Sequence, residues 1–139
     1  MPHQSELELE RIVRRLLPIL WPAGFEFELS ELGVNSGGSF AAGFFSRPPI
    51  RIGLIVRGAR LGMPNYVLGS GVSMKSHCDL VRVLRCENEP LLKWDEDNWR
   101  LVGEDGQDVV EALAWDLSNI ILPAIDAGEG PFREADLVR

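Results

Sequence analysis

The chain has 139 residues, 45% of them hydrophobic and 25% charged, which suits one globular domain with a single core. Its net charge of −7 is unevenly distributed, because residues 33–86 carry +6 whereas residues 87–139 carry −10. Nucleic acid is disfavoured as a partner, since duplex binding needs several unopposed phosphate contacts and the overall field is repulsive.

The N-terminus is acidic and polar, where a signal peptide would be basic and then apolar. No apolar run approaches the length of a membrane span, so we expect a cytoplasmic protein that does not bind membranes. The domain is expected to cover residues 1–128. Residues 129–139 are polar and carry Pro and Gly, which predicts a mobile tail.

The first expected element is a helix starting near Glu6. Ser5 and Glu8 form an S-x-x-E capping box before it, and apolar residues then recur at helical spacing. Pro18 removes the hydrogen bond to the Arg14 carbonyl, so the helix should end near Leu17 or kink there.

Three strands are expected next. Residues 25–29 alternate apolar and polar side chains, which predicts a half-buried strand before a turn at residues 34–38. Residues 40–45 and 50–57 also alternate, and they are separated by Arg47-Pro48-Pro49. Because proline cannot donate to a strand ladder, this segment predicts a corner between two strands.

Short strands are expected at residues 65–69, with Tyr66 and Leu68 on one face, and at residues 99–102. Two further capping boxes, Ser76 with Asp79 and Asp108 with Glu111, begin a second and a third helix. The third carries a long apolar stripe. This order predicts an α+β fold: an antiparallel sheet of four to five strands, with the N- and C-terminal helices packed on one face.

A basic patch on the strand expected at residues 50–57 is the first candidate site. Arg51 and Arg57 lie on its polar face with Gly53 between them, and guanidinium groups suit capture of carboxylate or phosphate. The candidate ligand-binding residues are Arg51, Arg57, Tyr66, Ser70 and His77. No nucleophile or base is evident beside them. The alternative is that the arginines pair with Glu26, Glu28 or acidic residues of the last third of the chain.

An acidic segment bracketed by two tryptophans is the second candidate site. Its residues, Trp94, Asp95, Glu96, Asp97 and Trp99, fit a contact surface for a basic protein partner, since Trp supplies interface anchors and carboxylates select basic partners. In the alternative interpretation both indoles pack on the core and the acids face water. A calcium loop is rejected, because Arg100 replaces the required glycine and Gly106 replaces the bidentate carboxylate.

Catalysis, metal binding and cofactors find little support. The run Ser76-His77-Cys78-Asp79 brings reactive side chains together in sequence, but at a helix start such side chains fan around the axis, so capping and packing are the simpler interpretation. We assign no catalytic residue, metal site or cofactor, and leave enzymatic activity open. Cys78 and Cys86 are eight positions apart, about 12 Å along a helix, which predicts free thiols.

One loose sequence pattern has a counterpart in known proteins. F-x-x-G-F-F at residues 40–45, R-I-x-L-I-V-R at residues 51–57, P-N-Y at residues 64–66 and Ser76-His77 resemble small bacterial α+β domains of unknown function that include immunity proteins of toxin systems. The resemblance implies an acidic protein that binds another protein. We therefore expect a non-enzymatic, immunity-like interaction module, with a binder of small anions as the alternative and a homodimer joined at an exposed sheet edge as a third.

Overall fold

The structure, a computed structural model, describes residues 4–35, 38–58, 60–69, 73–85, 92–103 and 108–133. The helices are α1 (Gln4–Leu20), α2 (His77–Arg85), α3 (Val109–Asp116) and α4 (Leu122–Ala127), with a π-helical turn (Leu117–Ile121) between the last two and a 3-10 turn (Gly130–Phe132) after them. The strands are β1 (Glu26–Asn35), β2 (Gly38–Arg47), β3 (Ile50–Arg57), β4 (Arg60–Leu61), β5 (Asn65–Leu68), β6 (Ser73–Ser76), β7 (Lys93–Asp95) and β8 (Arg100–Val102).

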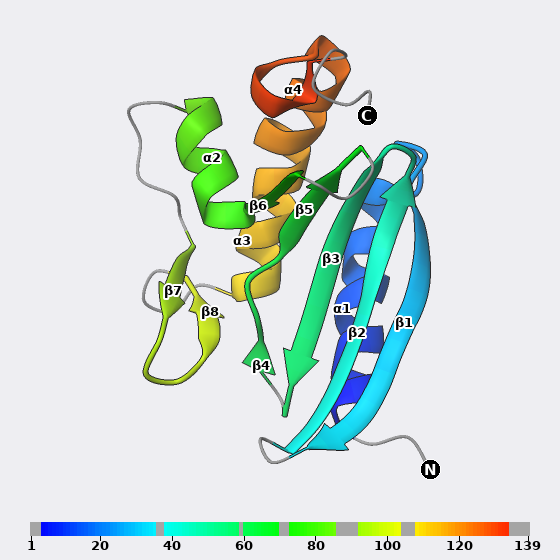
Figure 1. Cartoon of the computed structure of the whole chain (residues 1–139), viewed down its shortest axis with the longest axis vertical. Coiled ribbons are helices and arrows are strands. Elements are labelled where there is room, and N and C mark those ends of the chain that lie inside the picture. Colours follow the sequence, from blue (N-terminus) through cyan, green and yellow to red (C-terminus); the bar gives the residue numbers. More distant parts are fainter. Residues whose placement is uncertain are drawn as a thin grey trace.

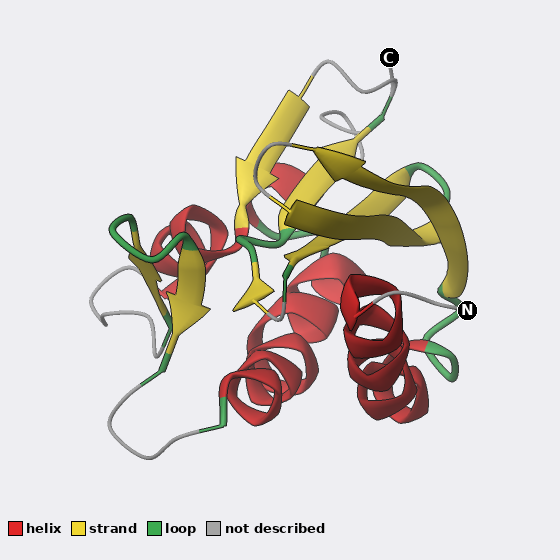
Figure 2. Cartoon of the chain, turned by 90° about the horizontal axis from the view of Figure 1, so that it is seen from below, coloured by secondary structure: helices red, strands yellow, loops and turns green. Residues whose placement is uncertain are grey.

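The main sheet is antiparallel, with the strand order β1-β2-β3-β5-β6 and β4 paired to β3 beside β5. α1 and α3 lie side by side against one face of this sheet, while none of the described helices lies on the opposite face (Figures 1 and 2). β7 and β8 form a separate hairpin. The structure therefore confirms the predicted α+β fold.

The core lies between the sheet and these helices. In β3, the four residues that face the helices are buried, and the register places Val56 opposite Ala41 and Ile52 opposite Phe45 in β2. Leu16 of α1 and Leu113 of α3 are each 1% exposed against this layer. Alternation in the strands and helical spacing in the helices thus point the apolar side chains to the same interior.

The predicted proline corner is confirmed. β2 and β3 pair from Phe40↔Arg57 to Arg47↔Ile50, and Pro48 and Pro49 form the connection between them. Neither proline has an N–H to donate, so both occupy positions where the ladder needs no donor.

The first helix differs from the expectation at both ends. α1 already includes Ser5, which is fully buried, and its Oγ lies 2.7 Å from the carbonyl oxygen of Gly58, so Ser5 anchors the helix to the sheet instead of capping it. The helix also continues past Pro18 to Leu20. Pro18 and Arg14 both lie on the exposed side, where water can satisfy the carbonyl that proline leaves free.

The C-terminal helical segment begins as predicted. The Asp108 carboxylate accepts hydrogen bonds from the N–H groups of Val110 and Glu111, which confirms the cap. A π-helical turn then interrupts it, with the Leu122 N–H bonded to the Leu117 carbonyl. Gly128 ends α4 in the left-handed conformation, with φ of 65°.

Part of the segment expected to be a tail packs on the domain. Phe132, at the end of the 3-10 turn, is 2% exposed and belongs to the core. Residues 134–139 lie outside the described part of the chain. The segment is polar in composition, but it contains one aromatic residue, Phe132, that is buried in the core.

Candidate functional site

The arginines singled out from the sequence lie on the helix-free face of the sheet. Arg51 is exposed and Arg57 is half-buried, and both alternate along β3 with the buried residues that face α1 and α3, so both belong to the row that points away from these helices. Gly53 lies between them with open space above its backbone on that face, apart from the Asn65 carbonyl. Alternation along the strand placed the two arginines correctly.

Both guanidinium groups lie over aromatic rings. That of Arg51 is 5.4 Å from the ring centroid of Phe44, and that of Arg57 is 4.7 Å from Trp99. Among the described residues neither arginine forms an ion pair, so the alternative pairing with Glu26 or Glu28 does not occur. Cation–π contacts replace it.

The separation of the arginines limits what they can bind. They are six residues apart in one strand, which corresponds to about 20 Å at the rise of a β-strand. Since each guanidinium is held over its own ring, one small anion cannot contact both. This face suits an extended surface better than a small ligand.

Tyr66 and His77 are not part of this patch. Tyr66 pairs with Ile52, whose side chain faces the helices, and both Tyr66 and His77 are fully buried on that side. Ser70 lies outside the described residues. The structure therefore brings Arg51 and Arg57 to one face and Tyr66 and His77 to the other.

A buried polar network connects Tyr66 of β5, His77 of α2 and Asp116 of α3. The Tyr66 hydroxyl lies 2.7 Å from His77 Nδ1, and His77 Nε2 lies 2.8 Å from Asp116 Oδ2. With a neutral imidazole protonated at Nε2, Tyr66 donates to Nδ1 and Nε2–H donates to Asp116. Burial, and secondly the negative charge of Asp116, raise the pKa of the Tyr66 hydroxyl well above its usual value, so this donor keeps its proton.

This network has a structural role. All three side chains are 0% exposed, so no substrate reaches them. Asp116 Oδ1 is buried and lacks a hydrogen-bond partner within the described part of the chain. The network fastens α2 and α3 to the sheet, and the π-helical turn begins directly after Asp116.

The sequence contained one signal for Asp116 that was missed. It lies three residues after Leu113 and four before Ile120, at the edge of the apolar stripe. An acid at that position, on a helix expected to bury the stripe, indicates a buried partner for the carboxylate.

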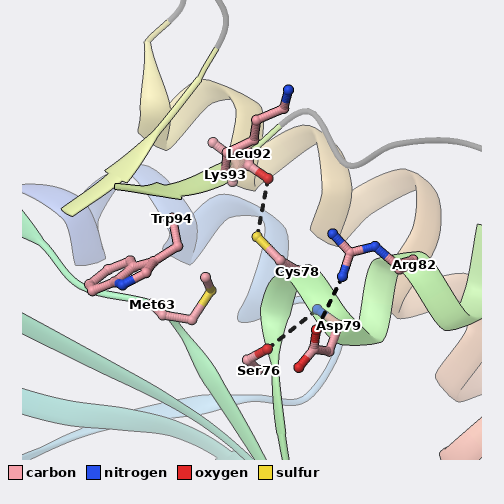
Figure 3. Close-up of a pocket in the computed structure, with 8 residues that line it drawn as sticks. All are labelled: Met63, Ser76, Cys78, Asp79, Arg82, Leu92, Lys93 and Trp94. Atoms are coloured by element: carbon pink, nitrogen blue, oxygen red, sulfur yellow. Dashed lines mark hydrogen bonds and ion pairs between the residues drawn. The ribbon is translucent and has the colours of Figure 1, made fainter. Parts of the chain in front are cut away.

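A pocket of about 400 Å³ opens beside the start of α2, between this helix and β7 (Figure 3). Arg82 pairs with Asp79 at 3.2 Å within it, and the Cys78 S–H points to the Leu92 carbonyl oxygen at 3.1 Å. Burial raises the pKa of Cys78 to about 11. A thiol that keeps its proton at neutral pH is a poor nucleophile, so the pocket offers no activated cysteine.

The acidic candidate residues come together on the β7–β8 hairpin. The ring centroids of Trp94 and Trp99 lie 5.4 Å apart in an edge-to-face arrangement. Asp95 accepts a hydrogen bond from the Asn98 amide at 2.8 Å, and this bond is the main cause that lowers the pKa of its carboxyl. Glu96 and Asp97 are exposed in the turn between the strands.

Cys78 is a free thiol, as predicted, while Cys86 lies outside the described residues. In the described ranges, no three His, Cys, Asp or Glu side chains gather to hold a metal ion. No described helix combines the length and the apolar character needed to cross a membrane.

Comparison with known proteins gives no relative. No protein family, curated protein or solved structure matches the chain.

Proposed function

We propose that the protein is a non-enzymatic interaction module that binds a basic partner protein through the acidic hairpin, defined as Trp94, Asp95, Glu96, Asp97 and Trp99. The observation that carries this proposal is the exposure of Glu96 and Asp97 on a turn whose base is held in place. The two indoles pack together, and Arg57 lies over Trp99, so the turn is fixed to the main sheet. A fixed acidic projection loses little conformational entropy on binding.

The charge of the hairpin is secure at physiological pH. The hydrogen bond from Asn98 favours the ionised form of Asp95, and Arg100 lies 3.7 Å from this carboxylate. Glu96 and Asp97 have no ion-pair partner among the described residues. Exposed carboxylates of this kind speed the approach of a basic partner more than they stabilise the fold.

Enzymatic activity is the weaker interpretation. The groups with the richest chemistry, those of Tyr66, His77 and Asp116, are sealed in the core, and Cys78 keeps its proton. An immunity-like role in the cytoplasm agrees with this binding function, and a free Cys78 suits a reducing compartment.

The test is charge reversal on the hairpin. The variant Glu96→Lys/Asp97→Lys should keep the melting temperature of the wild type and lose the partner that wild-type protein captures from its native cell. With the purified partner, association at low salt should slow by about tenfold or more, and the difference should shrink at high salt.

The matched control is Glu111→Lys/Asp126→Lys, which makes the same charge change at exposed helical positions. If both variants reduce association equally, only the net charge matters and the hairpin is not the binding surface. If the hairpin variant binds as the wild type does, the proposal is wrong.

A further inference from the structure

The edge of the main sheet at β1 is long and open. β1 has ten residues, and it is the terminal strand of the sheet, with β2 as its single neighbour in the described part of the chain (Figure 1). Backbone N–H and C=O groups along such an edge are available to pair with another strand. Natural proteins usually shorten or cover their edges, so an open edge of this length calls for an explanation.

The helix-facing side of β1 carries an apolar row that the helices leave uncovered. Leu29, Leu32 and Val34 pair with inward residues of β2, yet they are 46%, 42% and 75% exposed. Only Phe27, nearer the start of the strand, packs against the core. Three neighbouring apolar side chains beside an open edge form a surface that favours a partner.

The opposite side of the same strand carries an acidic row. Glu26, Glu28 and Glu31 are all exposed and lie opposite Ser46, Phe44 and Ala42, none of which is charged. Within the described residues, these carboxylates form no ion pair. No direct ion pair in this part of the chain therefore neutralises the row, and the nearest described cation on that face of β3, Arg51, lies over the ring of Phe44.

A β-bulge keeps the two rows apart. The pairing register shifts between Leu29 and Glu31, so that Ser30 is the extra residue. In a regular strand without the bulge, residues 29 and 31 would point the same way, which would place Glu31 on the same face as Leu29. The bulge thus gives the edge one continuous apolar side and one continuous acidic side.

We propose that the β1 edge binds an extended segment of a basic partner protein by strand addition, with Lys or Arg side chains over the acidic row and apolar side chains over the apolar row. Strand addition takes its affinity from backbone hydrogen bonds and its specificity from alternate side chains. An alternating basic and apolar strand matches both faces of β1 at once.

Charge complementarity favours this occupant over a second copy of the chain. In a pair of copies joined through β1, the acidic row of one copy would lie beside that of the other, and like charges on neighbouring strands destabilise a sheet. With a basic strand beside β1, the contacts of the acidic row are attractive. The inference rests on the proposed function, because it specifies how a basic partner binds, but it uses a different surface.

The test uses a ten-residue peptide of alternating lysine and valine, measured by fluorescence anisotropy against the full chain. We expect binding at low salt, together with slower hydrogen exchange of β1 amides. A peptide with the same residues in two blocks, and one that alternates glutamate and valine, should each bind at least about tenfold more weakly.

Charge-reversal variants test whether the peptide binds at the β1 edge. Glu28→Lys/Glu31→Lys should weaken binding of the lysine–valine peptide by about tenfold or more, since two attractions become repulsions, and should improve binding of the glutamate–valine peptide. The control Glu111→Lys/Asp126→Lys should change the affinity by less than about twofold. All four positions are exposed, so both variants should fold.

Several results would overturn the inference: no binding of the alternating peptide, equal binding of the block peptide, or unchanged exchange in β1. A wild-type dimer that Leu32→Asp separates would show that a second copy occupies the edge. If the native partner is lost by the hairpin variant and kept by Glu28→Lys/Glu31→Lys, the inference fails while the proposed function stands. If the native partner is instead kept by the hairpin variant and lost by Glu28→Lys/Glu31→Lys, the hairpin is not the binding surface and the β1 edge is.

Discussion

At the scale of single residues, the network of Tyr66, His77 and Asp116 makes a clear prediction. Tyr66→Phe removes the hydroxyl that donates to His77 Nδ1 and leaves this nitrogen buried without a partner. The free energy of unfolding should fall by about 1–3 kcal/mol, which urea denaturation would measure. A Tyr66→Phe variant as stable as the wild type would show that the hydrogen bond contributes nothing.

Cys78 is expected to make the stability of the folded protein fall as the pH rises in the alkaline range. Its pKa is raised from 9.0 to about 11 in the folded protein, so the folded state keeps a proton that the unfolded state loses. Stability should therefore be complete below about pH 9 and fall as the pH rises towards about 11, by up to about 2–3 kcal/mol. Tyr66, whose pKa is also raised, adds to the loss above about pH 10.

Urea denaturation at pH 8, 9, 10 and 11 would measure this loss. Cys78→Ala should flatten the curve between about pH 8 and 9.5, where the Tyr66 hydroxyl is still largely protonated in both states. Tyr66→Phe should flatten only the part above that range. An unchanged slope in Cys78→Ala would mean that the thiol has no raised pKa.

The candidate site shows what single residues reveal and what they conceal. Alternation placed Arg51 and Arg57 on one face, because that argument needs only one strand. To decide whether Tyr66 lies on the same face, one must know the pairing offset between β3 and β5. This offset puts Tyr66 opposite the inward-facing Ile52, and so on the other face from the arginines. That offset depends on the length of the connection through β4, and the sequence carries no local signal for it.

At the scale of elements, the direction of α3 is directly testable. Leu113 is 1% exposed against the sheet, whereas Glu111 lies on the exposed side of the same helix. Leu113→Asp should lower the free energy of unfolding by about 4 kcal/mol or more, since it buries an unpaired carboxylate in the core. Glu111→Lys should lower it by less than about 1 kcal/mol, the cost of a positive charge in the first turn of a helix.

Circular dichroism during thermal and urea unfolding would compare the two variants. A folded Leu113→Asp protein with the stability of the wild type would mean that the apolar stripe faces solvent. The comparison is informative because both positions lie on one helix, and the helix propensities of Asp and Lys differ by less than about 0.7 kcal/mol, which is small beside the cost of a buried carboxylate.

The elements that sequence reasoning found share strong local signals. Caps at Ser76 and Asp108 and alternation in β2 and β3 are confirmed because propensity, capping and burial agree there. β4 and β6 were missed because each is short and gains its strand geometry from a neighbour. β1 was predicted too short, since the bulge at Ser30 breaks the alternation by which strands are recognised.

At the scale of the whole molecule, charge separates the two functional interpretations. The basic residues of β3 lie over aromatic rings on an open face, while the β1 edge and the hairpin turn carry carboxylates, those of Glu96 and Asp97 among them, that form no ion pair within the described residues. This charge arrangement supports the proposal of a basic partner, because exposed carboxylates attract basic proteins at long range. Small anions are repelled by the net negative charge, and Arg51 and Arg57 lie too far apart to bind one of them together.

This arrangement predicts the outcome of a ligand screen. Inorganic phosphate, nucleotides and small carboxylates at millimolar concentration should raise the melting temperature by less than about 1 °C, because stabilisation grows with the ratio of ligand concentration to Kd. No single small anion can contact both Arg51 and Arg57 across about 20 Å of strand. Differential scanning fluorimetry would test this, with Arg51→Ala and Arg57→Ala as controls. A rise of several degrees that either variant abolished would restore the anion-binding interpretation. It would also mean that a guanidinium leaves its ring to reach the ligand, a movement that the loss of the Arg57 contact with Trp99 would reveal as a change in tryptophan fluorescence.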